Sequence, residues 1–152
     1  MGTHLKPGDP APEFAAPATD GHLLRSTDFL GRKLVLYFYP MDDTPGCTKQ
    51  ACSLRDTSAS IAARGAAIVG VSAQGSESHQ RFTEKYNLNF PLLADTDLKV
   101  AKSYGVAGSG LSGLLRSVAK VSERVTFIID ENGRISHIID DPDCPDHGEE
   151  VL

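Results

Sequence analysis

The sequence lacks any apolar run approaching the roughly 20 residues that a membrane-spanning helix requires. Its start, Met1–His4, lacks a hydrophobic signal region, and Lys6 stands where a myristoylation site needs Ser or Thr. We therefore expect a protein of the cytoplasm that has no membrane partner.

Concentrated positive charge is also missing. The net charge is -5, and Lys and Arg are scattered rather than gathered in a stripe that could neutralise a phosphate backbone. Nucleic acid is therefore not an expected partner. Apolar residues make up 40% and charged residues 23% of 152 residues, which is typical of a soluble globular chain. This length predicts a single domain spanning residues 1–152, because it is too short for two ordinary cores.

Cysteine is scarce, since Cys47, Cys52 and Cys144 are the only three. Such a number is odd and too small for a disulfide scaffold, and in a reducing compartment cysteines are more often reactive or buried than structural. The acidic, proline-flanked surroundings of Cys144 predict an exposed thiol with no part in the chemistry. Its C-x-x-H spacing with His147 supplies only two ligands, so we expect neither a zinc site nor any other metal or cofactor.

The apolar patterns predict an α/β fold with a central mixed sheet flanked by helices. Alternation of buried strands with helices favours parallel strands, whereas Asn132-Gly133 is a strong hairpin signal and requires an antiparallel pair. Four prolines within residues 7–17 predict an extended, turn-rich opening segment, and four glycines within residues 105–113 predict a mobile loop. The predicted strands are 33–39, 66–72, 124–129 and 134–139. The predicted helices are 47–64, 97–104 and one that opens at 76 and carries Phe82 and Tyr86 on one face.

Cys47 is placed where a buried strand has just ended and a helix begins, and Gly46 before it permits close backbone approach. Unpaired backbone N–H groups and the positive end of the helix dipole both favour an ionised sulfur at such a position. The thiolate is the nucleophilic form of cysteine, so this placement needs no metal. Taken alone, it is equally consistent with an inert, buried cysteine.

The residues around Cys47 resemble a known family. Residues 38–52, Phe-Tyr-Pro-Met-Asp-Asp-Thr-Pro-Gly-Cys-Thr-Lys-Gln-Ala-Cys, resemble the active-site stretch of peroxiredoxins, in the subgroup called peroxiredoxin Q or bacterioferritin comigratory protein. The family's Pro-x-x-x-Thr-x-x-Cys frame falls on Pro40, Thr44 and Cys47. The resemblance implies a thioredoxin-like fold, and it continues through segments 71–72, 77–79, 85–86, 90–93, 104–106 and 124–130.

The resemblance implies reduction of hydrogen peroxide and organic hydroperoxides. Cys47 would attack one peroxide oxygen and become a sulfenic acid. Thr44 would hydrogen-bond the thiolate and the peroxide, Pro40 would shield the site from water, and Arg124 would supply a fixed positive charge. Each of these three also has a simpler interpretation, as a helix cap, a strand terminator and a surface strand residue respectively.

Cys52 lies five residues after Cys47, which on an ideal helix is a rotation of roughly 140° and a rise of about 7.5 Å. The two sulfurs therefore cannot bond while the helix is intact. The resemblance assigns Cys52 as the thiol that resolves the sulfenic acid within one chain, so the helix would have to unwind locally. It further implies thioredoxin, or else glutaredoxin, as the reductant, and a monomer.

The chain departs from the subgroup at three places. Gln50 replaces the usual Glu, Met41 stands where Lys is common, and residues 147–152 look like only the first turn of a closing helix.

Two other functions remain open at this point. One is a dithiol-disulfide oxidoreductase, although that chemistry usually rests on two residues between the cysteines and here there are four. The other is a peroxide sensor or holdase that uses the same thiols without turnover.

Overall fold

The computed structural model describes residues 3–107, 123–140, 147 and 151. Within these ranges no helix is both long and apolar enough to cross a membrane. Cys144, most of the predicted glycine-rich loop and most of the predicted closing helix lie outside the described residues.

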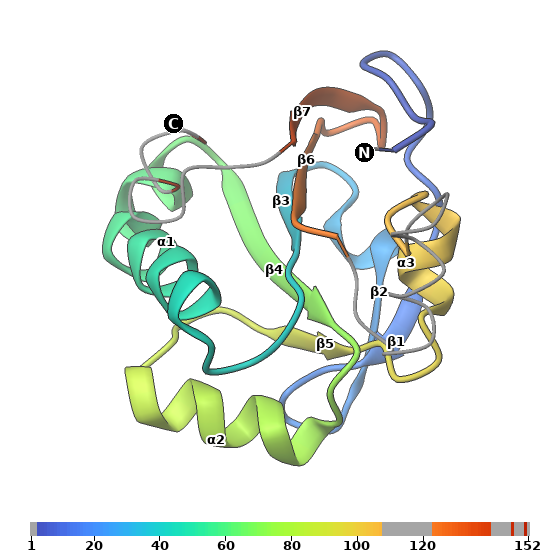
Figure 1. The fold of residues 1–152 in the computed structure, drawn as a ribbon. Coiled ribbons are helices and arrows are strands. Elements are labelled where there is room, and N and C mark those ends of the chain that lie inside the picture. The colour runs from blue at the N-terminus through green and yellow to red at the C-terminus, as the bar shows by residue number, and fades with distance from the viewer. Residues whose placement is uncertain (1–2, 108–122, 141–146, 148–150, 152) are drawn as a thin grey trace.

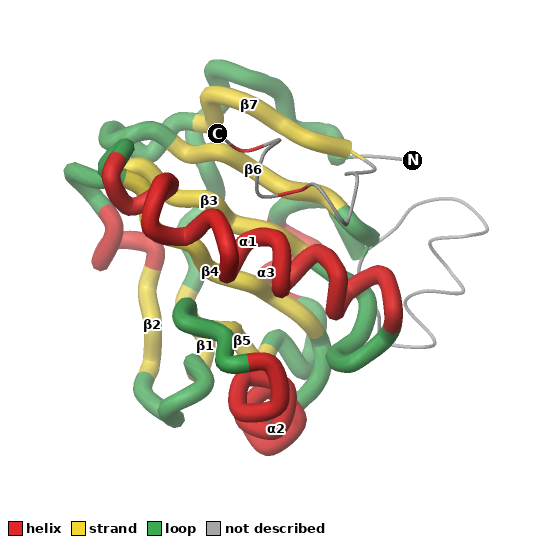
Figure 2. The backbone as a smooth tube through the Cα atoms, turned by 90° about the vertical axis from the view of Figure 1, so that its left-hand side faces the viewer, coloured by secondary structure: helices red, strands yellow, loops and turns green. Residues whose placement is uncertain are grey.

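Five strands form the main sheet, in the order β5-β4-β3-β6-β7. β3 pairs with β4, and β4 with β5, in parallel, whereas β6 is antiparallel to both β3 and β7. The prediction of a mixed sheet is therefore confirmed. Figure 2 looks onto one face of this sheet and shows the strands in that order from β7 at the top to β5. The strands are β3 (Lys33–Phe38), β4 (Ala66–Ser72), β5 (Leu92–Ala94), β6 (Val125–Ile129) and β7 (Ile135–Asp140).

Helices cover both faces of the sheet (Figure 1). α1 (Pro45–Ala63) covers one face, α3 (Lys99–Ser103) lies on the other with the hairpin of β1 (Ala15–Pro17) and β2 (Leu23–Arg25), and α2 (Ser76–Tyr86) lies beside β5. A short 3₁₀ helix, Ser26–Phe29, follows β2.

The central position of β3 in the sheet explains why its sequence is almost continuously apolar. Alternate residues of a strand point to opposite faces, and here both faces are buried. One set of β3 side chains packs in the core beneath α3, and the other packs beneath α1 together with Cys47. The first set is Leu34, Leu36 and Phe38, and the second is Val35, Tyr37 and the following Tyr39.

Most of the predicted boundaries agree with the structure to within one or two residues. The turn at Gly133 is confirmed, with a φ of 80° and an N–H that donates to the Asp130 carbonyl at 3.1 Å. Two strand pairings were not predicted. β5 has only three residues, and the proline-rich opening segment contributes β1 to a hairpin that turns through Asp20-Gly21.

Candidate active site

Cys47 is the third residue of α1, and Thr44 is the N-cap. The loop of residues 39–44 joins the end of β3 to this helix, and it includes Asp43 at a φ of 57°. The first helical bond runs from the Thr48 N–H to the Thr44 carbonyl at 2.8 Å. The Cys47 side chain is therefore at the helix terminus where backbone N–H groups are unpaired, as predicted, and the residue is only 1% exposed.

Arg124 lies directly against Cys47. Its Nη2 donates to the Cys47 Sγ at 3.2 Å. The antiparallel pairing of β3 with β6 makes this contact, because Val125 pairs with Phe38 and so places Arg124 beside the end of β3. Arg124 is half-buried and directly precedes β6, so it is not simply an exposed residue of that strand. A permanent guanidinium charge at this distance favours the thiolate and the negative charge that develops on a leaving oxygen.

Gln50 holds Arg124 in place. Its Oε1 accepts a hydrogen bond from Arg124 Nη1 at 2.7 Å, and the residue is 0% exposed. Within the described part of the chain, its Nε2 has no hydrogen-bond partner. The sequence marked Gln50 only as a departure from the family. Its spacing of three residues from Cys47 places both side chains on one helix face, and this signal could have identified it.

Replacing Gln50 with Leu is expected to lower the rate constant for reaction with peroxide about tenfold, because Arg124 loses the acceptor that orients its guanidinium. The free energy of unfolding should change by less than about 1 kcal/mol, since the change also removes an unpaired buried amide. Stopped-flow oxidation and urea unfolding measure the two quantities. An unchanged rate constant would contradict the positioning role of Gln50.

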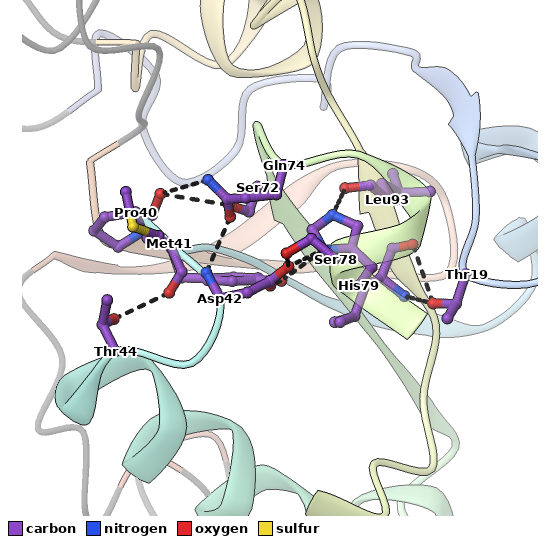
Figure 3. Close-up of polar contacts among 12 residues, drawn as sticks. Thr19, Pro40, Met41, Asp42, Thr44, Ser72, Gln74, Ser78, His79 and Leu93 are labelled. Atoms are coloured by element: carbon purple, nitrogen blue, oxygen red, sulfur yellow. Dashed lines mark hydrogen bonds and ion pairs between the residues drawn. The ribbon is translucent and has the colours of Figure 1, made fainter. Parts of the chain in front are cut away.

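Thr44 makes a different contact from the one expected of it. Its hydroxyl donates to the Met41 carbonyl at 3.0 Å, and its side chain makes no capping hydrogen bond to the helix (Figure 3). The simpler interpretation as a side-chain cap therefore has no support. A bond from Thr44 to the thiolate or to peroxide stays a prediction, and it would require the hydroxyl to exchange its present acceptor.

Pro40 is half-buried just beyond β3, and its carbonyl accepts hydrogen bonds from Ser72 Oγ and Gln74 Nε2, each at 3.4 Å (Figure 3). These contacts attach the loop to β4 and to the segment that follows it. The shielding of the site by the Pro40 ring stays a prediction.

Cys52 is half-buried within the same continuous helix as Cys47, and both are free thiols. The structure therefore represents the dithiol state with α1 intact. The resolving role of Cys52 stays a prediction.

A buried polar cluster lies behind the loop, and sequence analysis marked its helix residues only as part of a family resemblance. The carboxylate of Asp42 accepts hydrogen bonds from the Tyr39 hydroxyl at 2.6 Å and from Ser78 Oγ at 2.8 Å, and it pairs with His79 Nδ1 at 2.7 Å. Burial raises the pKa of the Tyr39 phenol well above its usual range, with the charge of neighbouring groups adding to the effect. Tyr39 is therefore a hydrogen-bond donor to Asp42 at any physiological pH.

Among the residues that the structure describes, no group of three or more His, Cys, Asp and Glu side chains could hold a metal ion. His147, the described member of the C-x-x-H pair, is buried, and its Nε2 contacts Thr126 Oγ1 at 2.8 Å.

A sulfur at a helix N-terminus, in contact with a guanidinium and excluded from water, is suited to nucleophilic attack on an electron-poor oxygen. Arg124 is placed to stabilise the negative charge that this attack passes to the leaving oxygen. The described site thus brings together a cysteine thiol, a helix N-terminus and a guanidinium.

Comparisons with known proteins agree with this chemistry. The model of the AhpC/TSA family matches residues 7–138. Peroxiredoxin Bcp of Escherichia coli (strain K12) is 40% identical over 148 residues, which cover 97% of this chain and 94% of that protein. Peroxidoxin BcpB from Mycobacterium tuberculosis has a TM-score of 0.85 at 33% identity, with 97% of this chain and 94% of the other covered. A mutant of PrxQ from Xylella fastidiosa has a TM-score of 0.86 at 27% identity, covering 99% and 94%.

These relatives confirm both the thioredoxin-like α/β fold and the family that the sequence resembles. They also argue against the first of the two alternatives, because the named relatives are peroxiredoxins rather than dithiol-disulfide oxidoreductases. The chain accordingly belongs to the AhpC/TSA family and, within it, to the peroxiredoxins of the Bcp and PrxQ type, which are thiol peroxidases.

Proposed function

We propose that the protein reduces hydrogen peroxide and organic hydroperoxides by direct attack of the Cys47 thiolate. The sulfur bonds to one peroxide oxygen, the O–O bond breaks, and the other oxygen leaves as water or an alcohol once it takes up a proton. Cys47 is oxidised to a sulfenic acid and the peroxide is reduced. The observation that carries this proposal is the 3.2 Å contact between Arg124 Nη2 and Cys47 Sγ, which supports charge on both the attacking sulfur and the leaving oxygen.

Cys52 is the proposed resolving thiol. Its thiolate attacks the sulfenic sulfur, the sulfenic oxygen leaves as water, and an intramolecular disulfide forms. Because both cysteines lie in one intact helix, this step requires α1 to unwind near its start.

Polar contacts with α2 flank the segment that would unwind, and they support our proposal that the unwinding is confined to that segment. Asp43 contacts Lys85 Nζ at 2.8 Å and the Tyr86 hydroxyl at 2.6 Å, just before the helix. Arg55 Nη1 donates to the Tyr86 carbonyl, just after Cys52. Residues 44–54, which contain both cysteines, can therefore unwind while each end stays attached to α2.

The proposed reductant is thioredoxin, with glutaredoxin as the alternative donor, and the proposed location is the cytoplasm. We propose that the protein acts as a monomer.

One equivalent of peroxide is expected to convert the wild-type protein to a single disulfide between Cys47 and Cys52, detected by peptide mass spectrometry. Cys52→Ser should instead accumulate the sulfenic acid and stop after one turnover with thioredoxin. Cys144→Ser is the matched control and should behave as the wild type. Sustained turnover by Cys52→Ser, or a disulfide to Cys144, would remove Cys52 from this role. Stoichiometric oxidation of the wild type without turnover would favour the sensor or holdase.

A further inference from the structure

The pairing of Asp42 with His79 joins three parts of the fold behind the active-site loop. His79 lies on α2 with its side chain 0% exposed, and Asp42 lies in the loop of residues 39–44 with its side chain 4% exposed. The imidazole lies between two oxygens, with Nδ1 at 2.7 Å from Asp42 Oδ2 and Nε2 at 2.8 Å from the carbonyl of Leu93 on β5 (Figure 3).

The contacts determine how many protons this pair holds. A carbonyl oxygen only accepts hydrogen bonds, so the His79 Nε2 facing Leu93 carries a hydrogen. The 2.7 Å contact between Nδ1 and Oδ2 requires a second hydrogen between them, because two lone pairs at that distance would repel each other, and both side chains are buried.

The surroundings place that second hydrogen on the imidazole. Asp42 already accepts hydrogen bonds from two hydroxyls, those of Tyr39 and Ser78, and such bonds favour the charged form of a carboxylate. Among the described residues, Asp42 and Tyr39 are the titratable side chains in contact with the imidazole. The hydrogen-bond geometry around His79 therefore fits an imidazole that donates from both ring nitrogens.

The carboxylate also holds the loop that surrounds Cys47. The Asp42 N–H donates to Gln74 Oε1 at 3.0 Å, and Gln74 Nε2 donates to the Pro40 carbonyl at 3.4 Å. Asp42 lies between Pro40 and Thr44, the two loop residues of the peroxiredoxin frame. A displaced Asp42 would therefore move both ends of the peroxide-binding loop.

We propose that His79 is a positioning residue for the peroxidase reaction, whose doubly protonated imidazole fixes Asp42 and thereby holds the loop of residues 39–44 in the form that accepts peroxide. This inference rests on the proposed role of Cys47 as the attacking thiol. Removing one partner of a buried ion pair leaves an uncompensated charge and destabilises the fold, so the variants of His79 are chosen to keep a hydrogen-bond donor, and the reaction with peroxide is measured on folded protein.

Two near-isosteric variants separate the two contacts of the imidazole. His79→Asn keeps a donor where Nδ1 faces Asp42, and His79→Gln keeps one where Nε2 faces Leu93. We expect His79→Gln to lose about tenfold to hundredfold in the second-order rate constant for peroxide, and His79→Asn to keep most of it. The first-order rate of disulfide formation should not fall in either variant, because loosening the loop does not oppose unwinding of α1. Equal losses in both variants, or equal losses in both steps, would overturn the proposal.

A measurement on the wild-type protein does not depend on how the variants fold. Nitrogen-15 NMR of the reduced protein at neutral pH should show both His79 ring nitrogens protonated. A resonance typical of an unprotonated Nδ1 would overturn the proposal. Cys47→Ser, measured in parallel, should show the same His79 spectrum without peroxide turnover. Retained turnover in Cys47→Ser would instead refute the proposed function and leave the His79 spectrum to be judged separately.

Discussion

Cys47→Ser is expected to lower kcat/KM for peroxide by at least about a thousandfold. The serine hydroxyl stays protonated at neutral pH and is a poor nucleophile even beside Arg124, whereas cysteine sulfur is intrinsically a much stronger nucleophile in the same position. The fold should persist, because serine is close to cysteine in size and keeps a weak polar contact for the guanidinium. Peroxide consumption coupled to thioredoxin and its reductase measures the change.

Two controls show that such a loss reports the nucleophile. Circular dichroism and thermal unfolding of Cys47→Ser should match the wild type within a few degrees, about the shift produced by less than 1 kcal/mol. Cys144→Ser should keep full activity. Full activity in Cys47→Ser would exclude every mechanism that uses Cys47.

Arg124→Gln is expected to lower the rate constant for Cys47 oxidation about a hundredfold to a thousandfold, the loss found when one preorganised donor to a developing oxyanion is removed. Glutamine keeps planar N–H donors but no charge, so the variant tests the charge rather than the packing. Stopped-flow measurement of the first turnover isolates this step from resolution by Cys52.

Arg124→Lys should retain more activity than Arg124→Gln but less than the wild type. A single ammonium group cannot reproduce the fork that donates to both Cys47 and Gln50. Arg81→Gln on α2 removes an exposed arginine and serves as the matched control, with no expected effect. If Arg124→Gln and Arg81→Gln behaved alike, charge beside the sulfur would have no role in the reaction.

The local parts of the fold could be predicted because their signals are contained within a few residues. β3 and β4 are runs of apolar and branched residues long enough to show that both faces are buried, and the turn at Gly133 depends on two adjacent residues. β5 could not be predicted in this way. Its three residues become a strand only by pairing with Gly70–Ser72 of β4, and so short a run shows no period of its own.

In the active site, too, only the features with a local sequence signal could be predicted. The sequence by itself determined that Cys47 lies at the start of a helix after a buried strand, and the residues around it were sufficient to identify the family. Arg124 entered only through that resemblance, and nothing local in the chain showed what Gln50, Asp42 and His79 contact. Only the tertiary structure decided those contacts, because they form where β6 pairs with β3 and where α2 packs beside the loop. A local pattern shows where a thiol can be reactive, whereas the charges and hydrogen bonds that act on it come from residues that only folding brings near.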